Sequence, residues 1–440
     1  MRRITPTATT IDGIPAFVAE QPASLPFFAG LMIRAGWGDE TLKTCGLTHL
    51  VEHLALPARH LPELELNGLV QDTTTLFWFS GEREAAIEQL LDTTRALCDL
   101  PLERLESERS ILFTEQESRS TGLVPLLKSL RFGARGYGLS HYEEHALRWV
   151  QREHVADWAT RHFTRANACL YVVGELPDSI GIELPEGRRI SPLPPQPIDY
   201  VRYPAAFGYG PPATIGVSFL ARRSVALMTA MRILEVRLRD TLRHQHGVTY
   251  ASDWVYEALT GDDAHVVVWA DAMEANVDRV RNVFLTVLDE LAFAGPTQEE
   301  LERDGKFFRE QLADPLSAPN MVFKCADDEL LRGVQTTDDE LLGELDALSP
   351  QDVAEALTET AHSMLLCVPQ ESSGVGGRFN DYPMEPPARV SGRRFKRRRT
   401  FLRRAQDGPE RELIVGPEGV TLIADGFTST VQYENCVALL

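Results

Sequence analysis

Two histidines and a glutamate occur at a spacing that suits a metal ion. His49, Glu52 and His53 lie within residues 46–56, which the apolar pattern predicts to be a short helix ending before Pro57. The three polar side chains fall on the face opposite the apolar stripe. Imidazoles four residues apart on a helix can bind one Zn²⁺, and a glutamate directly before the second histidine can serve as a general base. The alternative is that this face is only the solvent side of an amphipathic helix.

The H-x-x-E-H spacing occurs a second time, at residues 141–145, so the pattern alone does not locate a metal site. Downstream of the first occurrence, Glu108 and Glu115 are seven residues apart and share one face of a helix predicted at residues 102–117. No comparable pair of carboxylates follows residues 141–145. We therefore expect the metal at the first occurrence and a surface turn at the second.

The carboxylates of Glu108 and Glu115 are both expected to be buried. Their neighbours three or four positions away include Leu105, Ile111 and Leu112, which form the apolar stripe of the predicted helix. A buried carboxylate without a partner is costly, and binding a metal ion offsets that cost. This second helix therefore strengthens the prediction of a metal site over that of a solvent face.

The elements that must position these residues occur in the same order twice along the chain. The closing segments show the repeat most clearly, because His154-Val-Ala-Asp-Trp before one strand resembles Asp352-Val-Ala-Glu-Ala before another. This predicts two homologous α+β halves, each a mainly antiparallel sheet backed by helices, with a small C-terminal β-rich tail. The predicted strands are 28–35, 75–80, 168–173, 215–220, 250–256 and 265–269, and the predicted helices are 46–56, 82–99, 102–117, 154–162, 225–243, 275–294 and 298–312.

Composition divides the chain and limits its partners. A Pro-rich segment separates the halves, and eight Lys or Arg residues fall between residues 393 and 404, so the rest of the chain carries a net charge of −28. An acidic body disfavours nucleic acid as the main partner. The basic run could bind nucleic acid or anionic lipid, or could be a solvated linker or a clamp on an acidic surface. The predicted segments are 1–190, 191–207 (linker), 208–370, 371–404 (linker with the basic run) and 405–440 (β-rich tail, possibly an incomplete domain).

Cysteine spacing and hydropathy bear on the compartment. The six cysteines are far apart with no C-x-x-C pair, which predicts neither disulfides nor a thiolate zinc site. No apolar run reaches the ~20 residues of a membrane span, and the first residues lack the apolar region of a signal peptide. The sequence therefore predicts a cytoplasmic protein with no membrane span.

At these motifs the chain resembles the pitrilysin/insulinase family of zinc peptidases, the inverzincins, and in particular the short two-repeat chains such as the mitochondrial processing peptidase subunits. The resemblance rests on Gly46-Leu-x-His-Leu-Val-Glu-His, on Glu108-x6-Glu115 and on Arg243-x6-Tyr250, and it covers about residues 5–370.

The resemblance assigns a role to each residue of the predicted metal site. It implies that His49, His53 and Glu115 bind one Zn²⁺ per chain. It implies that Glu52 is the catalytic base and that Glu108 is a supporting carboxylate of the catalytic site. Residues 1–190 would then be the zinc-binding half.

The resemblance also assigns residues that contact the substrate. Arg243 and Tyr250 would contact the substrate carbonyl and its oxyanion, from a second half that is itself expected to be metal-free. Their alternative roles are a cation at a helix end and a tyrosine at the edge of the core. Asn67 matches an Asn-Ala pair of the family, although Gly68 replaces the alanine; Asn67 could equally be a turn former.

The implied function is zinc-dependent hydrolysis of peptide bonds in short or unfolded polypeptides inside a clamshell chamber. The implied partners are a peptide substrate and a second subunit, as a homodimer or as a heterodimer with a related chain. The alternative is a non-catalytic or partner-activating subunit of a heterodimeric peptidase.

Overall fold

The computed structural model describes residues 5–20, 25–57, 62–118, 122–177, 179–370, 372, 377–383, 388–396, 412–424 and 427–436. They form two compact units, Met1–Asp381 and Tyr382–Leu440. Within these ranges, none of the helices has both the length and the apolar composition needed to cross a bilayer. Cys98, Cys169, Cys325 and Cys367 are free thiols.

The first half of the larger unit contains a six-stranded sheet. Its strands are antiparallel to their neighbours except for the parallel pair β2 and β6. β4 lies at one edge and β1 at the other. The strand order is β1 (Thr7–Ile11), β2 (Ile14–Ala19), β6 (Ala168–Val173), β3 (Phe27–Ile33), β5 (Thr75–Gly81) and β4 (Leu64–Val70).

The second half repeats this sheet almost strand for strand. Its parallel pair β7 and β11 takes the place of β2 and β6, and β9 takes the place of the edge strand β4. The other edge strand differs, because β12 is parallel to β7 whereas β1 is antiparallel to β2. The order is β12 (Asn380–Asp381), β7 (Ala205–Gly210), β11 (Leu365–Pro369), β8 (Thr214–Arg222), β10 (Asp263–Asp271) and β9 (Ser252–Ala258). The predicted fold class of two homologous α+β halves is confirmed.

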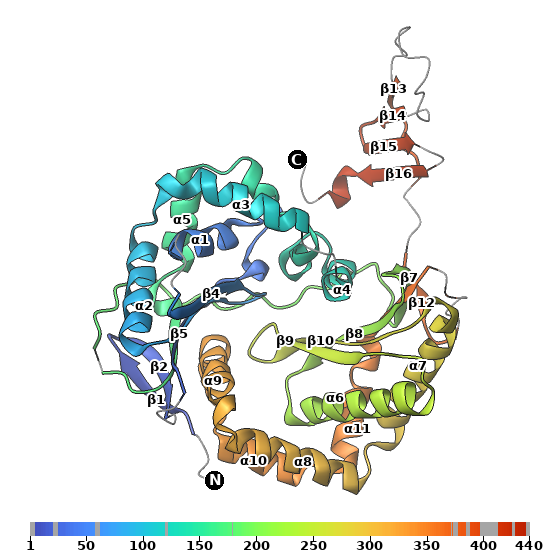
Figure 1. Ribbon diagram of the computed structural model, residues 1–440. Helices are drawn as coiled ribbons and strands as arrows, with labels where there is room; N and C mark the ends of the chain where they lie inside the picture. The colour runs from blue at the N-terminus through green and yellow to red at the C-terminus, as the bar shows by residue number, and fades with distance from the viewer. Residues whose placement is uncertain are drawn as a thin grey trace. The chain divides into compact units, whose positions relative to one another are not determined.

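The helices also occupy corresponding places in the two halves (Figure 1). Those of the first half are α1 (Leu47–Ala55), α2 (Arg83–Cys98), α3 (Leu105–Ser118), α4 (Leu123–Phe132) and α5 (Arg152–His162). Those of the second are α6 (Val225–Leu238), continued by the π-helical turn η6 (Arg239–Gln245), then α7 (Val277–Ala294), α8 (Gln298–Ala313), α9 (Ala318–Arg332), α10 (Asp338–Ala347) and α11 (Pro350–Thr358).

The two halves exchange one helix each. α9 of the second half packs its apolar side on the first sheet, where Ala318, Val322 and Ala326 join a core cluster that includes Tyr171. In Figure 1, α9 (orange) lies beside the strands of the first half. In return, α4 of the first half lies on the second sheet, and a Cβ added to Gly216 of β8 would lie 2.3 Å from the Leu123 side chain. The exchange joins the halves into one unit.

A buried ionic network strengthens this junction. The ammonium of Lys128 on α4 donates to Asp72 of the first half at 2.6 Å and to Glu257 on β9 at 2.5 Å. The carboxylate of Glu257 also accepts a hydrogen bond from His265 Nδ1 at 3.1 Å. Breaking one member would leave uncompensated buried charge, which costs several kcal/mol. The halves of one chain are therefore joined by buried charged groups as well as by the exchanged helices.

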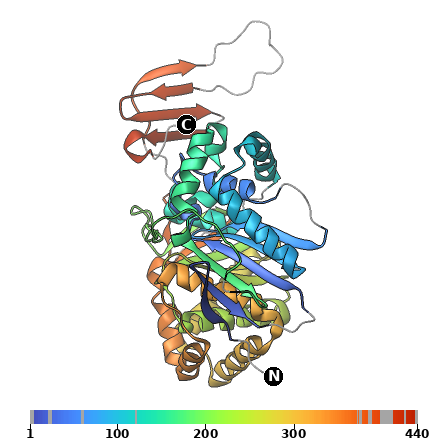
Figure 2. The ribbon, with the colours of Figure 1, turned by 90° about the vertical axis from the view of Figure 1, so that its left-hand side faces the viewer.

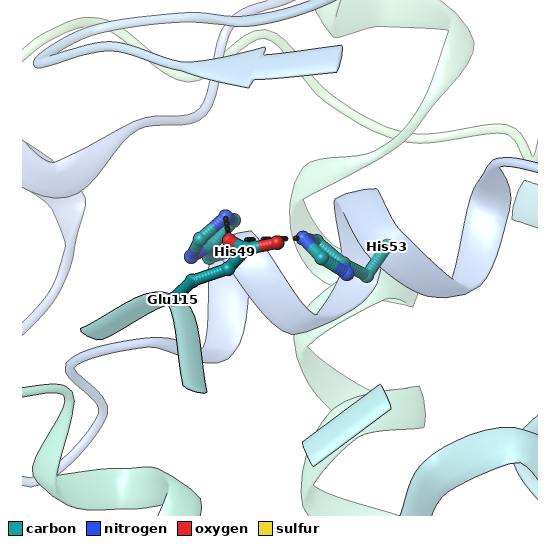
Figure 3. Close-up of side chains that lie close together, drawn as sticks. All are labelled: His49, His53 and Glu115. Atoms are coloured by element: carbon teal, nitrogen blue, oxygen red, sulfur yellow. Dashed lines mark ion pairs between the residues drawn. The ribbon is translucent and has the colours of Figure 1, made fainter. Parts of the chain in front are cut away.

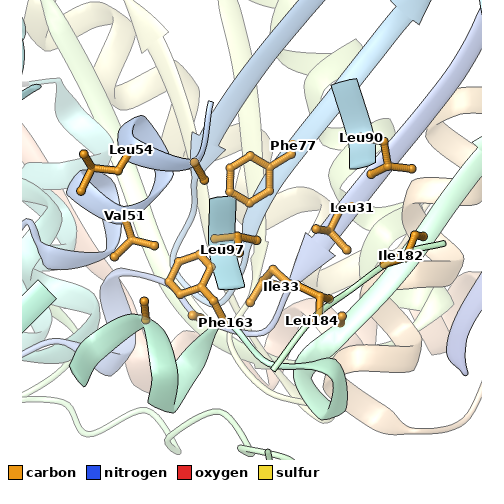
Figure 4. Close-up of a cluster of buried hydrophobic side chains, with 14 of the residues drawn as sticks. Leu31, Ile33, Val51, Leu54, Phe77, Leu90, Leu97, Phe163, Ile182 and Leu184 are labelled. Carbon is orange, nitrogen blue, oxygen red and sulfur yellow. The ribbon is translucent and has the colours of Figure 1, made fainter. Parts of the chain in front are cut away.

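The apolar stripe of α1 sets the orientation of the predicted metal helix. Leu47, Leu50, Val51 and Leu54 are all buried in the core of the first half, as their spacing predicts. Figure 4 shows Val51 and Leu54 among core side chains that the sheet contributes, such as Phe77. Burial of each large side chain contributes about 1.5–3 kcal/mol, so this packing fixes the helix face that turns away from the core.

The smaller unit is a four-stranded antiparallel sheet, seen in orange and red in Figure 2. Its strands follow one another in chain order as β13 (Arg393–Lys396), β14 (Glu412–Val415), β15 (Gly419–Ala424) and β16 (Phe427–Gln432). The β-rich tail is thus confirmed. β13 contains the start of the basic run, and residues 397–404 of that run lie outside the described residues.

Candidate metal centre

The N-terminus of α1 is fixed by a left-handed glycine and a buried carboxylate. Gly46 has φ 101°, where a side chain would be strained, and a Cβ there would lie 2.7 Å from Glu144 Cβ. The Glu40 carboxyl group accepts hydrogen bonds from the backbone N–H groups of Gly46 at 2.9 Å and of Thr48 at 2.8 Å. Burial raises the pKa of Glu40 to about 8, although these hydrogen bonds oppose the rise. The helix therefore begins at a defined residue and angle.

The structure brings the three predicted metal ligands together (Figure 3). The Glu115 carboxylate on α3 reaches both histidines of α1, with Oε2 lying 3.8 Å from His49 Nε2 and 3.7 Å from His53 Nε2. One donor atom from each of the three side chains lies within 4.8 Å of the others. In the described part of the chain, this is the single cluster of His, Cys, Asp or Glu that could hold a metal ion.

The other nitrogen of each histidine ring is held by a carboxylate. His53 Nδ1 is 3.3 Å from Glu108 Oε2, and the other oxygen of Glu108 accepts from Arg104 at 2.6 Å. His49 Nδ1 is 3.0 Å from Glu144 Oε1. Both Nε2 atoms are therefore directed toward Glu115. Such carboxylate–histidine pairs orient metal-binding imidazoles and raise their basicity.

Glu144 is the residue that sequence reasoning missed. It belongs to the second H-x-x-E-H, which does form short 3-10 turns, but its side chain is only 1% exposed and contacts the first motif. Its backbone N–H donates to the side-chain oxygen of Gln116 on α3 at 2.8 Å. A glutamate inside a polar turn carries no signal of this contact, because the contact depends on chain segments 95 residues apart.

Glu115 is more exposed than its position in the predicted apolar stripe implies. Its side chain is 45% exposed, whereas Glu108 is buried as predicted. The buried face of α3 is narrow: Leu105, Glu108 and Leu112 are buried, whereas Ile111 is 45% exposed. The prediction that both carboxylates are buried is therefore wrong for Glu115. Its exposed carboxylate leaves one side of the cluster open to solvent.

The Glu52 carboxylate lies between the histidines and the edge strand β4. Its Oε2 is 3.7 Å from His49 Nε2 and 3.8 Å from His53 Nε2, and the residue is 4% exposed. A Cβ added to Gly68 would lie 1.7 Å from Glu52 Oε1, so glycine provides the space that the carboxylate occupies. This is a physical reason for glycine at position 68.

Burial and like charge favour a protonated Glu52 in the metal-free site. Burial raises its pKa to about 7; His49 lowers it, and the carboxylates of Glu115, Glu108 and Glu144 raise it further. The pKa of His53 is lowered, first by burial and then by the charge of His49. A bound cation would reverse this balance for the carboxylates. The site is therefore arranged so that a positive charge stabilises it.

The donor set fits a zinc ion. Zinc bonds of ~2.0–2.1 Å in a tetrahedral arrangement place ligand atoms roughly 3.4 Å apart. The two distances from Glu115 to the histidine nitrogens are close to this value. Two imidazoles and one carboxylate, with the opposite ring nitrogens held by carboxylates, are also the donor types that zinc favours.

The predicted substrate residues lie in two different places. Asn67 is exposed within β4 and not in a turn, and β4 packs against α1. Arg243 lies in η6 of the second half with its guanidinium 5.5 Å from the ring centre of Tyr250, whose side chain is 80% exposed. Among the described residues, the metal-ligand cluster contains no member of the second half. Arg243 thus contacts Tyr250, and no hydrogen bond or ion pair recorded among the described residues joins either of them to His49, His53 or Glu115.

Comparison with known proteins identifies the fold. Neither a protein-family model nor a curated protein matches the sequence. Among solved structures, a protease from Helicobacter pylori aligns over 83% of this chain and 99% of its own, with TM-score 0.66 and 12% identity. A peptidase M16 inactive domain from Pseudomonas fluorescens aligns over 82% and 97%, with TM-score 0.65 and 13% identity. Pitrilysin aligns over 83% of this chain and 45% of its own, with TM-score 0.62 and 15% identity. The chain therefore has the fold of M16 peptidase domains.

Proposed function

We propose that this protein is a zinc-dependent peptidase that hydrolyses peptide bonds in short or unfolded polypeptides. The observation that carries the proposal is the geometry of His49, His53 and Glu115, whose metal-facing atoms converge while carboxylates hold the opposite ring nitrogens. The M16 fold supports it, because a protease from Helicobacter pylori and pitrilysin have similar structures. One zinc ion per chain is proposed, and the cytoplasm stays the predicted location.

Glu52 is the proposed general base. When bound, a zinc ion polarises a peptide carbonyl group and makes a neighbouring water molecule more acidic. The Glu52 carboxylate, close to both histidine nitrogens, accepts a proton from the attacking water and returns it to the departing amine. Glu108 keeps the His53 ring in its metal-binding orientation and is itself neutralised by Arg104.

The substrate is proposed to bind as an added strand on β4. β4 is at the edge of the first sheet and runs past the Glu52 carboxylate at Gly68. An edge strand offers unpaired N–H and C=O groups to an extended peptide. Asn67, exposed beside Gly68, is positioned to contact such a peptide. A folded protein cannot supply a free extended segment, which is why unfolded polypeptides are the proposed substrates.

Arg243 and Tyr250 are proposed to act on a substrate held by a second subunit. Both are exposed, and the two halves of one chain are joined by the exchanged helices and by buried ion pairs. Closure of a second copy over the first, rather than a hinge within one chain, would bring these side chains to the substrate carbonyl. Donors placed at a developing oxyanion are usually a large part of catalysis.

The alternative is a non-catalytic or partner-activating subunit of a heterodimeric peptidase. One similar structure is named an inactive domain, which favours keeping this alternative. Against it, this chain retains both histidines, the third ligand Glu115 and the base Glu52 in one cluster. The two functions make different predictions for Glu52. A catalytic chain needs this side chain for peptide cleavage, whereas a non-catalytic subunit does not.

The test is Glu52→Gln, assayed with an unstructured fluorogenic peptide library and by metal analysis. We expect zinc content to be unchanged and peptide cleavage to fall by several orders of magnitude, because ligand binding and proton transfer are separate roles. Cleavage at the wild-type rate by the variant would exclude Glu52 as the base. A wild-type protein that binds zinc and cleaves nothing until a related chain is added would favour the alternative.

The second subunit is tested by mixing two variants. Glu52→Gln and Tyr250→Phe are each expected to have low activity as homodimers, with Tyr250→Phe lowering kcat and leaving KM and zinc content nearly unchanged. Mixed dimers contain one site with both native residues if Tyr250 acts across the dimer, so mixing should restore part of the activity. Failure of any mixture to exceed the separate variants would contradict action across the dimer.

A further inference from the structure

A cavity of about 730 Å³ lies between the two halves of the larger unit. The first half contributes the turn after β4 and parts of α4 to its wall, and the second half contributes the start of α6 and residues of α8, α9 and α10. This volume is within the ~300–1,000 Å³ typical of ligand pockets. None of the roles proposed above uses this cavity.

Trp37 separates the cavity from the metal cluster. It lines the cavity, and its ring meets the His49 ring edge-on with 5.9 Å between ring centres. Its indole N–H donates to the carbonyl of Val70 at 3.0 Å. Val70 is the last residue of β4 and also lines the cavity. The cavity therefore adjoins both the cluster and the end of the proposed substrate strand.

Distance along β4 relates the cavity to the proposed point of cleavage. Gly68 is the residue of β4 that lies beside Glu52, and Val70 comes two residues after it. Two residues span about 6.7 Å along a strand. A peptide paired with β4 therefore has one residue beside Glu52 and another beside the cavity, two or three positions away along the peptide. Its side chain at that point can enter the cavity, whichever direction the peptide runs.

The charged groups of the cavity wall do not favour an anionic ligand. Each basic side chain of the wall is already bonded to a protein acceptor, such as Lys128 to Asp72 and Arg223 to Asp328. An anion would have to displace these partners. The others are Arg232 with Asp304, Lys324 with Asp328 and Arg332 with the carbonyl of Gly261.

The remaining wall is rich in apolar and aromatic side chains. They come from both halves and comprise Trp37, Met228, Phe308, Phe323, Leu341 and Leu345. These apolar and aromatic side chains are suited to a large apolar side chain of a substrate, because its burial removes apolar surface from water on both sides.

We propose that this cavity is a substrate subsite that takes a large apolar or aromatic side chain two or three residues from the cleaved bond. The inference rests on the proposed peptidase function and extends it, by naming a sequence preference that the metal cluster does not determine. The preference arises in one chain alone, because both halves of that chain form the wall.

The first experiment is cleavage of a peptide series by the wild-type protein. Each peptide has the same unstructured sequence of small polar residues with a single Phe moved through positions up to four residues on either side of the cleaved bond. We expect kcat/KM to rise roughly tenfold or more at one position, two or three residues from the bond. No positional preference, or a preference for Lys or Glu at that position, would overturn the inference.

The second experiment fills the cavity. Met228 lies in the first turn of α6, away from the metal cluster, so Met228→Trp reduces the cavity without touching the ligands. It should lower kcat/KM for the preferred Phe peptide roughly tenfold relative to kcat/KM for the peptide with Gly at that position. Phe293→Trp, at a 91% exposed site on α7, is the matched control. An equal loss for both peptides would contradict a subsite.

Binding separates failure of the subsite from failure of the proposed function. Fluorescence anisotropy with labelled Phe and Gly peptides should show weaker binding of the Phe peptide to Met228→Trp than to wild type, even if neither protein cleaves. Absence of cleavage with this binding difference would refute the peptidase and retain the subsite. Cleavage with no binding difference would refute the subsite and retain the peptidase.

Discussion

The same pair of helices has different chemistry in the two halves of this protein. In the first half, His49 and His53 on α1 face Glu108 and Glu115 on α3. In the second half, the corresponding helices are α6 and α8. There, Arg232 binds Asp304 through two hydrogen bonds of 2.7 Å, and Arg237 binds Glu300 through two more of 2.7 Å.

The comparison shows two ways to neutralise acidic groups between packed helices. The guanidinium groups of α6 are permanently charged, so they neutralise the carboxylates of α8 without a bound ion. Around the histidines of α1, Arg104 neutralises Glu108, whereas a bound cation would supply the positive charge for Glu52 and Glu115. A repeated fold thus supports a closed structural pair in one half and a candidate metal cluster in the other.

The largest effect is expected from breaking the arginine pair. Arg232→Met leaves the Asp304 side chain, which is 7% exposed, without its cation. We expect a loss of about 3 kcal/mol in the free energy of unfolding, measured by urea denaturation. Arg222→Met, in an ion pair whose side chains are 69% exposed, should change stability by less than about 0.5 kcal/mol. Equal effects of the two substitutions would show that the Arg232–Asp304 pair contributes no more than an exposed ion pair.

Glu144 tests whether the carboxylates around the histidines serve the metal. Glu144→Gln removes the charged acceptor of His49 Nδ1 and should weaken zinc binding by about 10–100-fold in competition with a chelator. His141→Ala, in the same H-x-x-E-H, should leave the zinc affinity at its wild-type value. If His141→Ala loses zinc and Glu144→Gln does not, the second motif has a different role from the one its contact indicates.

Gly68 tests the position of the proposed base. Gly68→Ala adds a methyl group 1.7 Å from the present position of Glu52 Oε1, so the carboxylate must move. We expect kcat to fall roughly tenfold with unchanged zinc content, because small displacements of a catalytic group lower its efficiency. Unchanged kcat would show that Glu52 acts from a position other than the one beside β4.

Two buried histidines, one in each half, give the smallest expected effect. Burial lowers the pKa values of His162 and His265 to about 4, although Glu257 opposes the shift of His265. Unfolded histidine binds a proton near pH 6.5, so protonation favours the unfolded state. The stabilisation is complete above about pH 6.5 and is lost progressively toward pH 4. His162→Phe should reduce this pH dependence of the unfolding free energy, and an unchanged slope would show that His162 does not contribute.

Much of the fold could be predicted from sequence, because the elements that place the cluster have strong local patterns. α1 is found where the i, i+3, i+4, i+7 stripe predicts it, and the closing helices and strands repeat as the aligned segments indicate. β4 was not predicted, because Asn67 and Gly68 disfavour a strand and are tolerated here at a sheet edge. α4 and α9 were not predicted either; each has a proline near its start, and each packs on the other half's sheet.

The candidate site was only partly predictable for a similar reason. His49, Glu52 and His53 are close in sequence, so their periodicity on one helix reveals them. The Glu144 contact and the space at Gly68 depend on segments that meet only in the folded chain. The exposure of Glu115 depends on where α3 leaves the core, which the helical period does not specify.

The central claim is that the cluster in the first half, and not its counterpart in the second, binds a metal ion. The most direct measurement is zinc content after dialysis of wild type, Glu115→Gln and Asp304→Asn, with folding confirmed by circular dichroism. We predict one zinc per chain in wild type and in Asp304→Asn, and none in Glu115→Gln. Folded wild-type protein without zinc after reconstitution, or a full zinc complement in Glu115→Gln, would contradict the claim.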